Sequence, residues 1–318
     1  MAQCVLGVDI GGSQIRSAIF DIEGQLLFRT QTTTPGESGP QAVIDSVLDR
    51  IAQALSSGRG DVAGIGIGVP GPADPDTGKI YYPPNLPGWG TRSILDPVRD
   101  QFGLPTFVGN DANVAALGEQ RFGAGKGILD LLYVTISTGI GGGIVSGGRL
   151  LTGWRGFAAE IGHQTLVIDG PKCSCGQRGH LEALASGPAI ARYVIDAVRD
   201  GRKSIVKGLT EGPEEITAAH VAEAAQQGDS LASEAFQTCG MYIGIGLANL
   251  IHILEPQLIL LGGGVTNAGD VLFDPIRSTV REHVMSEIFQ NIAIERARLG
   301  DDVGLYGAAA LALVGIEG

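Results

Sequence analysis

Short apolar runs separated by turn residues dominate the start of the chain, a pattern typical of buried strands. Residues 5–10 are mostly apolar and residues 15–21 form a second such run, with the turn Gly11-Gly12-Ser13 between them. We therefore predict a hairpin here, followed by a third strand over residues 25–30. Residues 40–57 change the pattern, because their apolar side chains follow helical spacing and a helix is expected there.

Strands and helices then alternate to the end of the chain. The further predicted strands cover residues 62–69, 105–108, 131–137, 143–145, 257–261 and 292–297. The further predicted helices cover residues 112–121, 188–199, 218–227 (with Thr217 as N-cap), 230–254, 271–284 and 303 onward. A strand, a glycine turn with a hydroxyl and a second strand occur twice, beginning near Val5 and near Leu132, which suggests duplication. This alternation predicts an α/β protein in two related lobes.

Length and composition agree with a folded protein of about two domains. The chain has 318 residues, 44% of them hydrophobic and 18% charged, and domains run to ~100–200 residues. We predict a smaller lobe of residues 1–120 with 301–318, and a larger lobe of residues 121–300. The 50 glycines are about twice the usual share of ~7% and cluster beside apolar runs, which indicates backbone that approaches a partner closely.

The charge balance narrows the classes of partner. With 22 basic and 34 acidic side chains the net charge is −12, and no basic run is present, so nucleic acid is not expected as a partner. The most apolar stretch, residues 241–254, is short for a membrane span and carries Asn249 and His252. Four cysteines are too few for a disulfide scaffold, and the chain begins without a signal-peptide pattern. We expect a soluble cytoplasmic protein with no membrane partner.

The two glycine turns are candidates for phosphate binding. Backbone without Cβ atoms lets N–H groups point at an anion, and a hydroxyl adds a donor. Asp9 ends a buried strand and could hold hydrated Mg²⁺, whereas an ordinary hairpin gives no reason for a carboxylate there. The residues that would form the two turns are Asp9, Gly11, Gly12, Ser13, Thr138, Gly139, Gly141 and Gly142. Two facing hairpins can clamp one polyphosphate between lobes.

Two common nucleotide motifs are excluded. No glycine-rich loop continues into Gly-Lys-Ser/Thr, so the P-loop signature is absent. Residues 66–71 fit GxGxxG, but prolines follow where the dinucleotide fold needs a helix. A different nucleotide fold is therefore required.

Asn110 and Asp111 lie between a predicted strand and a predicted helix, where open α/β sheets place their ligands. A carboxylate at this point could be an N-cap of the helix. It could instead be a general base that orients a substrate hydroxyl and accepts its proton.

The stretch from residue 156 to 182 carries a cluster of metal-binding residue types. His163, Cys173, Cys175 and His180 lie on glycine-rich backbone and suit a closed tetrahedral zinc site. The alternatives are free thiols with solvated histidines, or a redox pair, which would more usually be spaced Cys-x-x-Cys. Glu160 and Glu182 flank the cluster and are suited to holding sugar hydroxyls, although they could be surface carboxylates.

Taken together these residues resemble the ROK family (repressors, open reading frames and sugar kinases) of the actin–hexokinase–heat-shock ATPase superfamily. The resemblance spans nearly the whole chain and is most specific in residues 9–13, 109–113, 137–143, 160–163 and 173–182. It implies a two-lobed, duplicated actin/hexokinase-like (ribonuclease H-like) fold with an interlobe cleft. ATP with Mg²⁺ would bind there, its phosphates on the two glycine turns. The adenosine would lie near Gly262, Gly263 and Gly264.

The resemblance also implies roles for single residues. Asp111 would be the base that acts on a sugar hydroxyl. The sugar would be held by Asn110, Asp111, Glu160, His163 and Glu182, with Asn85 closing over it. Serine replaces the frequent threonine at Ser13 and keeps the hydroxyl. Histidine replaces the usual third zinc cysteine at His180, so a Cys2His2 structural zinc site is expected. Family precedent favours a homodimer or homotetramer.

The expected reaction is that of an ATP:hexose 6-phosphotransferase, with glucose as the first choice of acceptor because residues 84–89 and Glu182 resemble the glucokinases of the family. N-acetylmannosamine, N-acetylglucosamine and fructose kinases share most of these motifs and stay open as alternatives. A sugar-sensing repressor is a second class; such members carry an N-terminal helix-turn-helix domain, whereas only about three residues precede the first strand here. A donor other than ATP, such as polyphosphate, is also compatible with the glycine turns.

Overall fold

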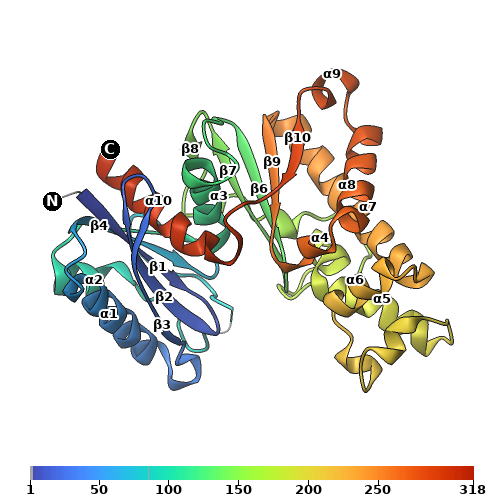
Figure 1. Cartoon of the computed structure of the whole chain (residues 1–318), viewed down its shortest axis with the longest axis horizontal. Helices are drawn as coiled ribbons and strands as arrows, with labels where there is room; N and C mark the ends of the chain where they lie inside the picture. Colours follow the sequence, from blue (N-terminus) through green and yellow to red (C-terminus); the bar gives the residue numbers. More distant parts are fainter. Residues whose placement is uncertain (1–2, 85) are drawn as a thin grey trace. The chain divides into compact units, whose positions relative to one another are not determined.

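The computed structural model describes residues 3–84 and 86–318. Its strands are β1 (Gln3–Ile10), β2 (Gln14–Asp21), β3 (Leu26–Thr33), β4 (Asp61–Val69), β5 (Thr106–Asn110), β6 (Leu131–Ile136), β7 (Ile140–Ser146), β8 (Arg149–Leu150), β9 (Leu258–Gly262) and β10 (Ala293–Arg296). Its α-helices are α1 (Pro40–Ser56), α2 (Leu95–Phe102), α3 (Asp111–Phe122), α4 (Leu181–Ala185), α5 (Gly187–Arg199), α6 (Ala218–Gln226), α7 (Ser230–Leu254), α8 (Asp270–His283), α9 (Ser286–Phe289) and α10 (Val303–Glu317). Figure 1 shows these elements along the chain.

Two five-stranded sheets share one strand order. The first runs β3-β2-β1-β4-β5 and the second, read from its short strand, runs β8-β7-β6-β9-β10. In the first sheet β1, β4 and β5 are parallel, while β2 runs antiparallel to both of its neighbours, β1 and β3. The α/β fold class and the repeated strand–turn–strand pattern predicted from the sequence are confirmed.

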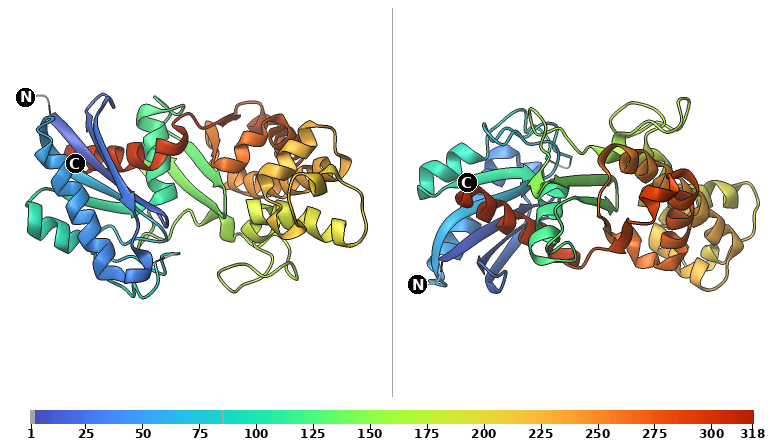
Figure 2. Two further views of the ribbon diagram at one scale, coloured as in Figure 1. Left: turned by 60° about the horizontal axis from the view of Figure 1, so that its bottom comes forward. Right: turned by 90° about the horizontal axis from the view of Figure 1, so that it is seen from above.

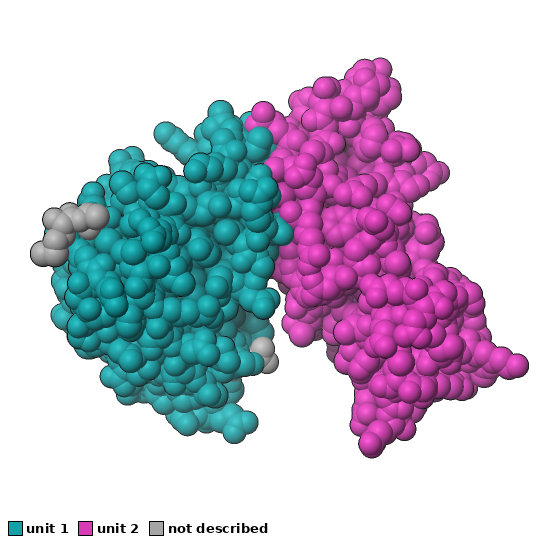
Figure 3. Space-filling model, viewed as in Figure 1, with its two compact units in different colours: residues 1–133, 143–159, 297–318 teal, residues 134–142, 160–296 magenta. Residues whose placement is uncertain are grey.

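The contacts divide the chain into two compact units, coloured separately in Figure 3. Unit 1 comprises residues 1–133, 143–159 and 297–318, and unit 2 comprises residues 134–142 and 160–296. These units are defined by contacts within the chain. The lobe boundaries predicted from the sequence stay a prediction.

The first sheet of unit 1 carries a helical layer on each face, as Figures 1 and 2 show for α1 and α10. On β1 the side chains of Leu6, Val8 and Ile10 pack with those of α1, whereas Val5 packs with α10. This alternation follows from the two-residue repeat of a strand. On the α10 face, a Cβ atom on Gly66 would lie 1.8 Å from the backbone oxygen of Ala308, so only glycine admits the helix at this distance.

Unit 2 is built around α7, which packs against α4, α5, α6 and α8. By length and composition this helix could cross a membrane, but 44% of its most apolar window is buried inside the protein. Its buried face includes Phe236, Ile243 and Leu247, which are typical of a core helix in a helical layer. The predicted N-cap of α6 is also confirmed, because Thr217 and His220 form a capping box there.

Several short elements were missed by the sequence pattern. The Pro- and Gly-rich stretch before β5 contains α2, in which only Leu95 and Val98 are buried, and a left-handed Gly103 ends it. The four-residue α9, the five-residue α4 and the two-residue β8 are too short to show a period. Their conformation follows from packing against neighbours more than from local sequence.

A fully buried carboxylate fastens the segment by which the chain returns to unit 1. Glu119 of α3 accepts hydrogen bonds from the backbone N–H groups of Arg298 (2.8 Å) and Leu299 (2.7 Å) through Oε1. Its Oε2 accepts from the N–H group of Ala124 at 2.8 Å. Both oxygens of this buried carboxylate therefore accept from backbone N–H groups.

Replacing Glu119 by glutamine is expected to lower the free energy of unfolding by about 2–4 kcal/mol, because the amide nitrogen must face a backbone N–H group. Urea unfolding followed by circular dichroism measures the change. The matched control is Glu317→Gln, which removes the charge from an exposed ion pair with Arg121 (2.6 Å) and should cost under about 1 kcal/mol. Equal effects in both variants would contradict a special role for the buried carboxylate.

Candidate active site

The first glycine turn joins β1 to β2 and stands beside a buried ion pair. Asp9 is 7% exposed, and its cross-strand partner in the β1–β2 register is Arg16. The Asp9 Oδ2 atom accepts from Arg16 Nε at 3.0 Å and from Arg16 Nη2 at 2.5 Å. Arg16 Nη1 donates to the backbone oxygen of Asp301 at 2.7 Å. Asp9 was predicted from the sequence, whereas Arg16 was not, although counting residues across the hairpin from its turn places Arg16 opposite Asp9.

Helix α10 begins against the Asp9 carboxylate. Gly304 is the second residue of that helix, and a Cβ atom there would lie 2.7 Å from Asp9 Cγ. The positive end of the helix dipole therefore faces a negative charge, which stabilises both. Gly12 and Ser13 of the adjoining turn are exposed, and Thr34 bonds the carbonyl oxygens of Gly11 and Ser13.

The carboxylate of Asp111 is not the N-cap of α3. That role belongs to Asn110, the last residue of β5, whose Oδ1 accepts from the backbone N–H groups of Ala112 (3.0 Å) and Asn113 (3.1 Å). The Asn110 amide nitrogen donates to the Gly71 carbonyl oxygen at 3.1 Å. Asp111 is the first residue of the helix, is exposed, and accepts from the N–H group of Ala112 at 2.7 Å. The N-cap is therefore Asn110, and Asp111 adds an exposed carboxylate in the first turn of the helix.

The second glycine turn lies between β6 and β7, belongs to unit 2 and is shorter than predicted. Because β7 begins at Ile140, Gly141 and Gly142 lie in the strand and not in the turn. Hydrogen bonds from other elements hold the turn in place. The Ser137 carbonyl oxygen accepts from the Gly187 N–H group at 2.8 Å, and the Ile140 N–H group donates to Glu182 Oε2 at 3.2 Å. The hydroxyl-bearing Thr138 is exposed. The turn thus combines a backbone held by hydrogen bonds with the exposed hydroxyl of Thr138, which suits anion binding.

A cavity of about 800 Å³ adjoins this turn within unit 2. It brings together Thr138 and Gly264, two residues that the sequence analysis assigned to the nucleotide, while Gly262 and Gly263 do not line it. Helices α5 and α6 supply much of the wall, which the sequence analysis missed. These lining residues include Pro188, Ala191, Arg192, Ile195, Ala218, Ala222, Glu223 and Gln226. The mostly apolar wall with a few polar groups is typical of a small-molecule site.

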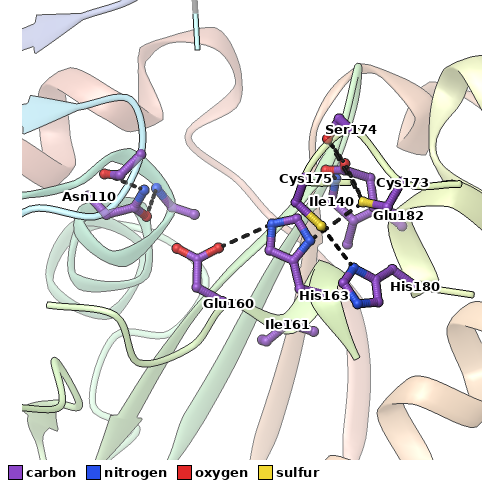
Figure 4. A network of polar contacts seen from close by, with 12 residues as sticks. Asn110, Ile140, Glu160, Ile161, His163, Cys173, Ser174, Cys175, His180 and Glu182 are labelled. Atoms are coloured by element: carbon purple, nitrogen blue, oxygen red, sulfur yellow. Dashed lines mark hydrogen bonds and ion pairs between the residues drawn. The ribbon is translucent and has the colours of Figure 1, made fainter. Parts of the chain in front are cut away.

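The four predicted metal ligands come together in unit 2, as Figure 4 shows. The ligand atoms of His163, Cys173, Cys175 and His180 all lie within 4.8 Å of one another. Cys173 Sγ lies 3.7 Å from His163 Nδ1, and Cys175 Sγ lies 3.3 Å from His180 Nδ1. Tetrahedral zinc with bonds of ~2.0–2.3 Å needs ligand atoms about this far apart. The donor set therefore fits the ion.

Burial tunes two of these ligands. It lowers the pKa of His180, and the neighbouring His163 ring lowers it further, so that the imidazole stays neutral and able to bind a metal. Burial also raises the pKa of the Cys173 thiol. A bound cation would favour the thiolate instead.

The flanking glutamates differ in their surroundings. Glu160 Oε2 lies 3.7 Å from His163 Nε2, on the ring nitrogen opposite the one near Cys173. Burial raises the pKa of Glu160, which the nearby His163 partly offsets. Glu182 bonds the second glycine turn and also accepts from the Ser174 hydroxyl at 2.8 Å. The predicted sugar ligand Asn85 lies outside the described residues.

Comparison with known proteins places the chain in a family. The sequence pattern of the ROK family matches residues 5–314. A glucokinase of Thermotoga maritima is 36% identical over 96% of both chains. The crystal structure of a ROK family glucokinase from Streptomyces griseus in complex with glucose and AMPPNP is 37% identical, with a TM-score of 0.83 over 98% of this chain and 99% of that one. The xylose repressor of Bacillus subtilis is 30% identical over 97% of this chain and 76% of its own. On these matches and on the fold, the chain belongs to the ROK family.

Proposed function

We propose that this protein transfers the γ-phosphoryl group of ATP to the 6-hydroxyl of an aldohexose, with glucose as the preferred acceptor. The similar proteins named as glucokinases support this activity. The observation that carries it is an exposed carboxylate, Asp111, at the first position of α3 with the N-cap supplied by its neighbour Asn110.

In this proposal Asp111 accepts the proton of the 6-hydroxyl as its oxygen attacks the γ-phosphorus in line. Ser13 and Thr138 offer exposed hydroxyls, and their glycine turns offer backbone N–H groups, to the phosphates. Asp9 would face a hydrated Mg²⁺, which the nucleotide brings and which neutralises phosphate charge. Arg16 Nε and Nη2 both donate to Asp9 Oδ2. Asp9 Oδ1 takes no part in these two bonds and would suit a water molecule of the hydrated ion.

We propose that the cavity of unit 2 takes the adenosine of ATP. Its volume of about 800 Å³ falls in the usual range for ligand pockets, and it begins at Ser137 and Thr138 of the second glycine turn. Apolar side chains such as Ala191 and Val265 would contact the faces of the base, while Glu223 and Gln226 could pair with its polar edge.

We propose that Asn110, Glu160, His163, Glu182 and Asn85 hold the sugar, and that the four-residue cluster binds structural Zn²⁺. Zinc supplies rigidity to the loop between His163 and His180. Nδ1 of His163 lies toward Cys173, so metal binding at that nitrogen would hold the ring in one orientation. Its Nε2 would then be available to contact Glu160 or a sugar hydroxyl. We also propose lobes of residues 1–120 with 301–318 and 121–300, a cytoplasmic location and a homo-oligomeric state.

A panel of sugars tests the proposed reaction. With Mg-ATP as donor, we expect the largest kcat/KM for glucose, at least tenfold above N-acetylmannosamine, N-acetylglucosamine and fructose, because a pocket that bonds the 2-hydroxyl rejects an altered 2-position. Product analysis should give the 6-phosphate. Replacing ATP by polyphosphate at fixed glucose is the donor control, and a higher rate with polyphosphate would assign the donor differently.

A sugar-responsive regulator is the second candidate, favoured by the similarity to the xylose repressor. Its test is retention of DNA on a filter with and without sugar. Sugar-dependent retention without phosphorylation of any sugar in the panel would replace the kinase proposal. The net charge of −12 leads us to expect no retention.

A further inference from the structure

Glu182 connects the metal-binding loop with the second glycine turn. Its Oε1 accepts from the Ser174 hydroxyl at 2.8 Å. Cys173 Sγ lies 3.5 Å from the same oxygen and can donate to it only as a thiol, so Ser174 is the donor that persists when Cys173 binds a metal as a thiolate. Its Oε2 accepts from the Ile140 N–H group at 3.2 Å. Figure 4 shows Ser174, Cys173 and Ile140 gathered around this one carboxylate. One carboxylate oxygen therefore accepts a hydrogen bond from the metal-binding loop, and the other accepts one from the glycine turn.

The contact with the glycine turn is close. A Cβ atom on Gly139 would lie 2.5 Å from Glu182 Oε2, so the carboxylate occupies the space of a side chain at that position. The same turn is bonded on its other side, where the Ser137 carbonyl oxygen accepts from Gly187 N–H at 2.8 Å. Glu182 is the second residue of the short helix α4, which starts directly after the predicted metal ligand His180, and Gly187 follows that helix as the first residue of α5. The turn and the cluster are thus attached to the same element.

The contact with the loop lies between metal ligands. Ser174 separates Cys173 from Cys175 in the sequence, so a metal held by both thiolates fixes the backbone on either side of its hydroxyl. Without that metal, the backbone beside Ser174 loses this restraint. A carboxylate that loses one partner can rotate, and the Ile140 N–H bond on its other oxygen depends on that rotation.

We infer that Glu182 is a positioning residue through which occupancy of the Cys/His cluster sets the geometry of the phosphate-binding turn at Thr138. This inference rests on the proposed kinase function and gives the metal a second effect, on the nucleotide, besides orienting His163 toward the sugar. It leaves Glu182 able to accept a sugar hydroxyl as well, because a carboxylate has about four acceptor positions.

Ser174→Ala is the decisive variant, since Ser174 is exposed and the substitution retains all four metal ligands. In the zinc-loaded wild type, removal of zinc with a chelator should raise the dissociation constant for AMPPNP about three- to tenfold, the change expected for one such hydrogen bond. Zinc-loaded Ser174→Ala should start with this weakened affinity and respond little to the chelator. Calorimetric titration measures both.

Three further variants separate the coupling between the metal-binding loop and the glycine turn from other effects. Gln177→Ala changes an exposed residue of the same loop and should behave as the wild type. Glu182→Gln can still accept from Ile140 through its oxygen and donate to Ser174 through its nitrogen, so it should protect the Ile140 amide, whereas Glu182→Ala should not.

Hydrogen exchange at Ile140 provides a readout that does not depend on catalysis. We expect exchange to accelerate about three- to tenfold on chelation or in Ser174→Ala. Unchanged exchange and unchanged AMPPNP affinity on chelation of the wild type would overturn the inference, as would an equal chelator effect in wild type and Ser174→Ala. Failure of the proposed reaction alone would leave the exchange result intact, so the two failures are distinguishable.

Discussion

Replacing Asp111 by asparagine is expected to lower kcat for glucose phosphorylation by about 10²–10⁴-fold, the usual contribution of a positioned general base. Asparagine has the size of aspartate and can still contact a hydroxyl, but it cannot take up the proton. The KM for glucose should therefore change little, since ground-state contacts survive. Steady-state kinetics with varied glucose and saturating Mg-ATP measures both parameters.

Stability should not explain that loss. Because Asn110 caps α3, the variant keeps the helix start, and its melting temperature should stay within a few degrees of the wild type. Asp270→Asn is a matched control, because Asp270 is likewise an exposed first residue of a helix. That variant should retain full activity. Near-normal turnover in Asp111→Asn would assign the base elsewhere.

The second large effect is expected from a substitution in the Cys/His cluster. Cys175→Ser should abolish the binding of about one zinc per chain and lower the free energy of unfolding by several kcal/mol, because metal binding to a folded site adds to folding stability. The substitution removes one of four donors and changes volume little. Elemental analysis of the purified protein and thermal unfolding measure the two effects.

Thiol labelling provides an independent check on the same site. Chelation should make Cys173 and Cys175 reactive toward a disulfide reagent, with the exposed Cys175 reacting first. Cys4 and Cys239 should stay protected in the folded protein because both are buried, and burial raises the pKa of Cys239 to about 12. A zinc-free preparation with unchanged stability and four equally reactive thiols would contradict the cluster.

Much of the fold followed from local pattern. Strands such as β1 and β9 are buried apolar runs. Helix α1 carries an apolar period and begins at a proline, and α7 begins after its N-cap Asp229. The Cys/His cluster could also be predicted, because its residue types are rare and closely spaced. In each case neighbours along the chain supply the information.

What the sequence did not show depends on contacts between distant residues. The wall of the unit 2 cavity comes from α5 and α6, and ordinary residues such as Arg192 and Gln226 acquire a place there only through packing. The same holds for Glu182, whose bond to Ile140 spans 42 positions. The pairing of Arg16 with Asp9 could have been predicted more easily, since the hairpin register alone places the two residues opposite each other.

The position of α10 has a consequence for biosynthesis. Helix α10 covers the face of the first sheet that includes Val5, Ala18 and Phe20, so β1 and β2 meet this covering layer only after the whole of unit 2 has been synthesised. At roughly 5–20 residues per second the wait is on the order of tens of seconds, during which an apolar sheet face stays open. Nascent chains of this protein should therefore require chaperone protection until α10 has emerged.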